Sequence, residues 1–255
     1  MVEQVRMELP RLGGRKLYYL LQPKLSGLSV GRDKLFSILK ANHMLIEPKR
    51  RYHITTDSHH RFRKHKNLID GIKLTRPEQV WVADITYVGN RESPMYLAMI
   101  TDAYSKKIVG HNLSDSLETK GAARALKMAI GNKQHSTQQL IHHSDRGLQY
   151  CSDQYQRILK NYHLKCSMTE TYDPYANAIA ERVNGIIKHE FLLNEYNLDL
   201  KTMRELIAES IYTYNEKRPH LSCSMLTPNQ MHKQNEIKIK TYKKKSSSKN
   251  ILATA

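Results

Sequence analysis

The chain has 255 residues, and its 41 lysines and arginines against 24 aspartates and glutamates give a formal net charge of +17 at pH 7. That length allows one substantial domain and a smaller one. The excess of positive charge favours a polyanionic partner. Nucleic acid suits it better than an anionic membrane, because no amphipathic or spanning segment accompanies the charge. The longest apolar run, residues 95–100, is far too short to cross a bilayer.

Cysteine usage and the N-terminus bear on cellular location. Cys151, Cys166 and Cys223 are odd in number and widely spaced, so neither a disulfide framework nor a zinc site is indicated. A reducing compartment fits this usage, and no apolar signal region begins the chain. We therefore expect a cytoplasmic protein that associates with the nucleoid.

Residues 1–47 are predicted to form a helical region. No element is indicated for residues 1–12, but apolar residues favour a short helix over 13–21. A glycine-containing turn follows at 26–29, and a second helix has its apolar side at 35–44. Two short helices around a glycine turn are compatible with a helix-turn-helix, and equally with a generic helical hairpin.

Residues 48–75 differ in composition and are predicted to be a basic linker. The stretch 48–66 holds Asp57 as its one acidic residue beside seven lysines and arginines. Such a segment can lie along phosphates instead of packing into a core, and a solvated tether is the alternative for each side chain. The arginines expected on DNA are Arg50, Arg51, Arg61 and Arg63.

Residues 76–236 are predicted to form an α/β core. Strands are expected at 80–88, 95–102, 107–114, 140–144 and 164–167. Helices are expected at 118–131, 152–163, 177–188 and 201–217, and Pro219 ends the last one. Short turns make the first three strands an antiparallel meander, and strands then alternate with helices. We therefore predict a mixed five-stranded sheet with helices on its faces. Residues 237–255 form a basic low-complexity tail, which we expect to be disordered.

Three carboxylates could meet within this core. Asp84 lies in the middle of an apolar strand, Asp145 ends another strand, and Glu181 lies on a polar helix face. A carboxylate inside such a strand is unfavourable unless it is paired, hydrogen-bonded or bound to a cation. A structural aspartate and a solvated helix remain the alternatives for each segment alone. The rival carboxylates Asp102 and Asp173 are explained by an ion pair with Lys106 or Lys107 and by a turn before proline.

Carboxylates that meet repel one another, so their pKa values rise unless cations neutralise them. Ligands that are all oxygen indicate Mg²⁺ or Mn²⁺ rather than zinc. Two such ions about 3.5–4 Å apart could contact the attacking and leaving oxygens of a phosphodiester. On the Glu181 face, Lys188 is expected to reach DNA phosphate, and Asn177 and Asn184 to contact DNA or orient Glu181. His143 is expected to be a hydrogen-bonding neighbour of Asp145.

Four blocks of sequence carry a family resemblance. They are Trp-Val-Ala-Asp-Ile-Thr-Tyr at 81–87, His-His-Ser-Asp-Arg-Gly-Leu-Gln-Tyr at 142–150, Ala-Ile-Ala-Glu-Arg-Val-Asn-Gly-Ile-Ile-Lys at 178–188 and Tyr-Asn-Glu-Lys-Arg-Pro-His at 214–220. An interval of 35 residues separates Asp145 from Glu181, and Lys188 follows seven residues later. Together these features resemble the DDE transposases of bacterial insertion sequences, of the third insertion-sequence family and its downstream reading-frame product. The catalytic core of that family is similar to that of retroviral integrases.

The resemblance implies an RNase H-like fold in which Asp84, Asp145 and Glu181 hold two Mg²⁺ or Mn²⁺ ions. It implies DNA cleavage and strand transfer on terminal inverted repeats and target DNA, by a homo-multimer and through a fusion with an upstream helix-turn-helix product. It also favours DNA binding by the N-terminal helices. The zinc module of integrases is not expected, because the histidines before the core have no cysteine near them. An RNase H-like nuclease that cuts without joining, and an inert DNA-binding remnant, are the other hypotheses. Packing is the favoured role for the block at 214–220.

Overall fold

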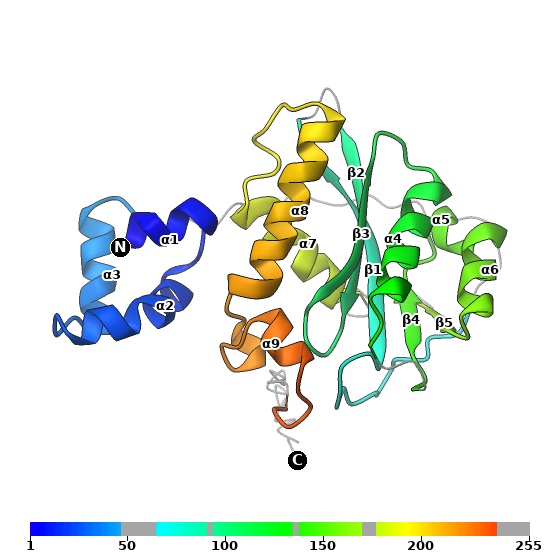
Figure 1. Cartoon of the computed structure of the whole chain (residues 1–255), viewed down its shortest axis with the longest axis horizontal. Coiled ribbons are helices and arrows are strands. Elements are labelled where there is room, and N and C mark those ends of the chain that lie inside the picture. Colours follow the sequence, from blue (N-terminus) through cyan, green and yellow to red (C-terminus); the bar gives the residue numbers. More distant parts are fainter. Residues whose placement is uncertain (47–64, 91–93, 135–137, 170–176, 239–255) are drawn as a thin grey trace, which may run out of the picture.

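The computed structural model describes residues 1–46, 65–90, 94–134, 138–169 and 177–238. Within these ranges a group of N-terminal helices lies beside a larger core built on one sheet (Figure 1). The linker arginines Arg50, Arg51, Arg61 and Arg63 lie outside the described residues, as do Asp173 and the tail beyond residue 238. No helix in the described ranges is both long and apolar enough to span a membrane.

The sheet has five strands in the spatial order β3-β2-β1-β4-β5. β1 (Val80–Val88), β2 (Met95–Asp102) and β3 (Ile108–Ser114) pair antiparallel, as their short connections require. β4 (Ile141–Ser144) and β5 (Lys165–Met168) run parallel to β1 and are reached through helical crossovers. The predicted mixed five-stranded sheet is confirmed.

Helices cover both faces of the sheet (Figure 1). One face carries α4 (Thr119–Gly131), α5 (Leu148–Cys151) and α6 (Asp153–Asn161). The other carries α7 (Ala178–Glu190) and α8 (Leu200–Lys217). Alternation along β1 divides its side chains: Trp81 and Ala83 pack toward α4, whereas Val80 and Val82 pack beside Ala180 of α7. Asp84 follows the second set, so it faces α7.

Gly110 in β3 allows α4 to pack closely on the sheet. A Cβ atom at this position would lie 2.2 Å from the carbonyl oxygen of Ala125 and 2.8 Å from the backbone nitrogen of Ala129. The facing side of α4 is built from small residues, among them Ala122, Ala125 and Ala129, which are all buried. Small side chains on both elements therefore set the distance between helix and sheet.

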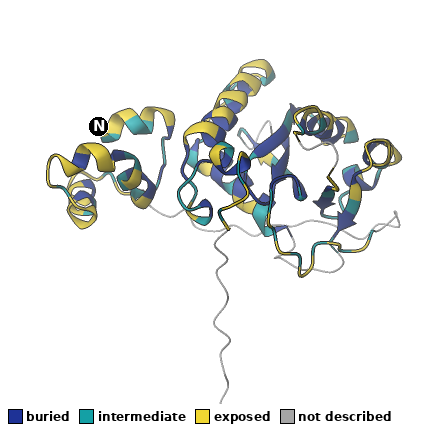
Figure 2. Cartoon of the chain, turned by 60° about the horizontal axis from the view of Figure 1, so that its bottom comes forward, coloured by how far each residue is buried: buried dark blue, intermediate teal, exposed yellow. Residues whose placement is uncertain are grey.

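The N-terminal region consists of α1 (Val2–Glu8), α2 (Gly14–Ser26) and α3 (Arg32–Ala41). α1 was not predicted; seven residues carry too little periodicity to indicate a helix. Buried leucines of this region form one apolar cluster with the side chains between the sheet, α7 and α8. Figure 2 shows the exposed residues of these helices on their outer sides. The guanidinium of Arg6 donates to the carbonyl of Met44 at 2.6 Å and so joins α1 to the end of this region.

The block at 214–220 fastens α8 to the start of β3. Asn215 accepts a hydrogen bond from the Ile108 amide through Oδ1 and donates to the Ile108 carbonyl through Nδ2, both at 3.0 Å. The Tyr214 hydroxyl donates to the Lys106 carbonyl at 2.8 Å. These contacts agree with the packing role expected for the block. A short helix, α9 (Pro228–His232), follows and begins with a capping box at Thr227.

Candidate active site

Parallel pairing of β1 and β4 brings Asp84 and Asp145 to one level of the sheet. Val82 pairs with His143, and each aspartate lies two residues further along its strand. Neighbouring strands lie about 4.8 Å apart, so the two side chains emerge side by side. β4 ends at Ser144, and Asp145 is held at the strand end by the Gly147 amide, which donates to its Oδ1 at 2.9 Å.

Helix α7 places Glu181 beside this pair. Its N-cap residue, Asn177, donates from Nδ2 to the Ala83 carbonyl at 3.2 Å, and Asn184 donates to Asp84 Oδ2 at 2.7 Å. The two amides lie on either side of Glu181 along the helix and fasten α7 to β1. Glu181 itself remains exposed on the first turn and a half of the helix.

The three carboxylates interact electrostatically. Burial, followed by the charge of Asp145 and then that of Glu181, raises the pKa of Asp84 to about 7. The Ile85 amide, at 2.9 Å from Oδ1, and the Asn184 amide oppose this rise. The site therefore lacks positive charge close to Asp84, and it consists of oxygen donors that suit a hard divalent cation.

The donor set fits such a cation in chemistry, although the side chains are not closed around a point. Within the described residues, no three His, Cys, Asp or Glu side chains converge closely enough to hold a metal ion. Asp84 is fixed by two hydrogen bonds, whereas the side chain of Glu181 is exposed. A change in the Glu181 side chain is thus the smallest movement that would bring all three together.

Lys188 lies near the carboxylates, as the helical face predicted. Its side chain is half-buried; burial lowers its pKa, and the nearby charge of Asp84 opposes that effect. Asn177 and Asn184 were expected to contact DNA or to orient Glu181. In the structure both are buried and bond to β1, so the residue that Asn184 orients is Asp84.

His143 has a partner that the sequence did not indicate. Its Nδ1 lies 2.9 Å from Ser167 Oγ on the neighbouring strand β5, and burial lowers the pKa of the ring to about 4. The imidazole is therefore neutral at pH 7. Ser167 Oγ also accepts from the Leu68 amide at 2.8 Å, which brings the segment before the core against β5.

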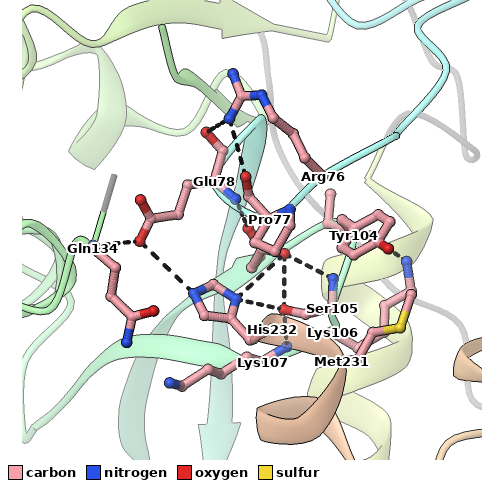
Figure 3. Close-up of polar contacts among 12 residues, drawn as sticks. Arg76, Pro77, Glu78, Tyr104, Ser105, Lys106, Lys107, Gln134, Met231 and His232 are labelled. Atoms are coloured by element: carbon pink, nitrogen blue, oxygen red, sulfur yellow. Dashed lines mark hydrogen bonds and ion pairs between the residues drawn. The ribbon is translucent and has the colours of Figure 1, made fainter. Parts of the chain in front are cut away.

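The rival carboxylate Asp102 has a structural role. It is fully buried and accepts hydrogen bonds from the amides of Glu78 and Ser105, both at 2.7 Å, rather than forming the expected ion pair with a lysine. Figure 3 shows the surrounding cluster, in which Ser105 Oγ lies 2.9 Å from His232 Nδ1 and Glu78 Oε1 lies 3.7 Å from His232 Nε2. This buried cluster joins α9 to the loops at the start of the sheet.

Comparisons with known proteins define the class. Two family models, each described as an integrase core domain, match residues 75–174 and 162–228. The cryo-electron microscopy structure of a simian T-cell lymphotropic virus intasome, in complex with PP2A regulatory subunit B56 gamma, is similar with a TM-score of 0.54. The sequences are 19% identical over 91% of this chain and 78% of that one, so this likeness shows the fold alone. The chain has the RNase H-like core of the integrases and DDE polynucleotidyl transferases.

Relatives narrow the class to a family. The chain is 36% identical to the insertion element IS600 uncharacterized 31 kDa protein of Shigella sonnei, over 80% of this chain and 75% of that protein. It is 34% identical to the transposase for insertion sequence element IS904 of Lactococcus lactis subsp. lactis, over 66% and 67%. Transposase InsF for insertion sequence IS3fB of Escherichia coli is 34% identical over 62% of this chain and 55% of its own length. The chain belongs to the DDE transposases of bacterial insertion sequences, in the IS3 family.

Proposed function

We propose that this chain cleaves DNA at the ends of an insertion sequence and joins the cut end to target DNA, with Asp84, Asp145 and Glu181 holding two Mg²⁺ or Mn²⁺ ions. Membership of the transposase family supports the reaction. The observation that carries the residue assignment is the electrostatic interaction among the three carboxylates, two of which lie at one level of adjacent parallel strands. When bound, the ions would activate the attacking oxygen and stabilise charge on the phosphate.

The protein's own groups have separate tasks in this proposal. Asn184 and the Ile85 amide hold Asp84 in one orientation, and the Gly147 amide does the same for Asp145. Asp84 must be ionised to bind a cation. Lys188, close to Asp84, would contact a DNA phosphate next to the reacting one.

We propose a division of labour along the chain as well. Residues 1–47 bind DNA through their helices, residues 48–75 follow the phosphate backbone, residues 76–236 catalyse, and residues 237–255 add non-specific affinity. The net charge of +17 supports extensive phosphate contact. The DNA partners are the terminal inverted repeats and the target, bound by a homo-multimer at the nucleoid, and the working protein includes an upstream helix-turn-helix product fused to this chain.

The test is a cleavage assay on a labelled insertion-sequence end in Mg²⁺. Asp84→Asn, Asp145→Asn and Glu181→Gln should each lower the rate by at least about 10²–10³ while end binding persists. Glu205→Gln, on the exposed side of α8, is the matched control and should cleave normally. Normal cleavage by any of the three site variants would remove that residue from the assignment.

A pre-cut donor end separates the transposase from a nuclease. Joining of this end to a second DNA molecule supports strand transfer. Cleavage of the intact end without any joining of the pre-cut end would identify a nuclease instead. A protein that binds DNA and does neither would be an inert remnant.

A further inference from the structure

Glu190, the last residue of α7, forms a buried ion pair with Arg218. The guanidinium donates from Nε to Oε2 at 2.7 Å and from Nη2 to Oε1 at 2.6 Å. Arg218 is fully buried, and the side chain of Glu190 is 18% exposed. This two-point contact fixes the end of α7 to the residue that follows α8, because the geometry of a bidentate pair restricts both side chains.

The same glutamate contacts the N-terminal helices. Its carbonyl accepts a hydrogen bond from the Arg11 amide at 3.1 Å, and Lys16 Nζ of α2 lies 3.7 Å from its Oε1. The side chain of Lys16 is only 11% exposed. We call Lys16, Glu190 and Arg218, with the Arg11 amide, the Glu190 junction. It joins three segments: the N-terminal region, the catalytic helix and the end of α8.

Charges within the Glu190 junction are unequal in number. Burial and the charge of Arg218 lower the pKa of Lys16 to about 8, and Glu190 opposes this fall. The pKa of Glu190 is lowered although burial alone would raise it, because Arg218, Lys16 and Arg182 outweigh burial. Two buried cations therefore depend on one carboxylate. Burying Lys16 here is unfavourable in itself, so the contact contributes geometry more than stability.

A second ion pair between the same regions provides a comparison. Lys217 Nζ lies 2.8 Å from Glu8 Oε1, but the two side chains are 45% and 54% exposed. An exposed pair of this kind restrains the chain little, because solvent screens it and both side chains must lose freedom to form it. The Glu190 junction is the buried connection.

We propose that Glu190 and Lys16 are positioning residues, which hold the N-terminal helices in a fixed orientation relative to the helix that carries Glu181. Glu181 and Glu190 lie nine residues apart on α7, about 14 Å along its axis. DNA bound by the N-terminal helices would therefore meet the carboxylates at one distance and angle. This inference rests on the proposed function, because it concerns how DNA is presented to that site.

The test uses Lys16→Met in the full chain. This variant removes the contact of α2 with the junction and leaves the Arg218–Glu190 pair intact, whereas replacing Glu190 would strand a fully buried arginine and endanger folding. Cleavage at saturating end DNA should fall about tenfold or more, since a small misplacement of substrate is costly. The affinity for the end should stay within about twofold. Lys16→Arg, which keeps the cation, should stay within about threefold of wild type.

Hydrogen exchange gives a reading that a general loss of stability would not reproduce. The Arg11 amide should exchange faster in Lys16→Met, while amides of β1 should be unchanged. Lys217→Met is the matched control and should alter neither exchange at Arg11 nor cleavage by more than about twofold.

The inference is overturned if Lys16→Met cleaves at the wild-type rate at saturating DNA, if weaker end binding explains the whole loss, or if β1 opens together with Arg11. Asp84→Asn, assayed in parallel, keeps this result separate from the proposed function. If Asp84→Asn cleaves normally, the catalytic assignment fails. If it is inactive while Lys16→Met behaves as wild type, only the positioning role fails.

Discussion

Replacing Arg218 with methionine should destabilise the fold through loss of one ion pair. The guanidinium makes two short hydrogen bonds to Glu190, donates to the Pro219 carbonyl at 3.3 Å and lies 5.7 Å from the centre of the Tyr214 ring. Removing one partner from a buried pair costs about 3–5 kcal/mol, because the other charge stays behind. Glu190 retains some solvent and the nearby Lys16, so we expect the lower end, about 3 kcal/mol.

Urea unfolding at pH 7 measures this loss. Lys217→Met, which removes the neighbouring exposed cation, should change the free energy of unfolding by less than about 0.5 kcal/mol. The double variant Glu190→Met with Arg218→Met should recover part of the loss, because it leaves no charge buried alone in that pair. A loss below about 1 kcal/mol for Arg218→Met, or a double variant no better than the single one, would refute the reasoning.

The loss should also depend on pH. The pKa of Glu190 is lower in the folded protein than its ordinary value of 4.5, chiefly through Arg218 once burial has been overcome. A group with a lowered folded-state pKa stabilises the protein above its unfolded value, and that contribution disappears as the pH falls through the folded value. The difference between wild type and Arg218→Met should therefore be full at pH 7 and narrow below pH 4.5. A difference that stayed constant down to acidic pH would show that lost packing, rather than charge, explains it.

Two further predictions concern the active site. Asn184→Ala removes a hydrogen bond to a carboxylate, worth about 1.5–3 kcal/mol, so cleavage should fall roughly 10- to 150-fold with folding retained; Asn132→Ala, which loses a bond to the Val109 carbonyl on the α4 side, should cleave normally, and an active Asn184→Ala would exclude the orienting role. Lys188→Ala should weaken end binding and reduce the slope of log K against log salt by about one. Lys127→Ala on exposed α4 should leave that slope unchanged, and an unchanged slope for Lys188→Ala would contradict a phosphate contact.

The bounds of β1 and β2 could be predicted residue for residue, because apolar runs and turn residues on each side determine a central strand. The level of Asp84 with Asp145 could not. It depends on the register between β1 and β4, which are separated along the chain by two strands and a helix, and no local pattern encodes that register.

Asn184 shows the limit of helical periodicity most clearly. The period placed it on one face with Glu181 and Lys188, and that face was interpreted as polar and outward. In the structure Asn184 is 5% exposed, because β1 lies against that side of α7. A helical pattern states which residues share a face, but the tertiary packing decides what covers that face. Asp84, unfavourable in a strand unless it has a donor, was the signal that could have predicted an amide partner.

The backbone position of Glu181 follows from contacts on both sides of it along α7. Asn177 bonds to β1 four residues before it, Asn184 bonds to Asp84 three residues after it, and Glu190 fixes the end of the helix nine residues after it. Since the helix rises by a fixed amount per residue, these contacts leave its backbone little freedom. The exposed side chain of Glu181 is then the part that can adjust when cation and DNA arrive. A fixed helix with one adjustable carboxylate explains how three groups can interact electrostatically without yet enclosing an ion.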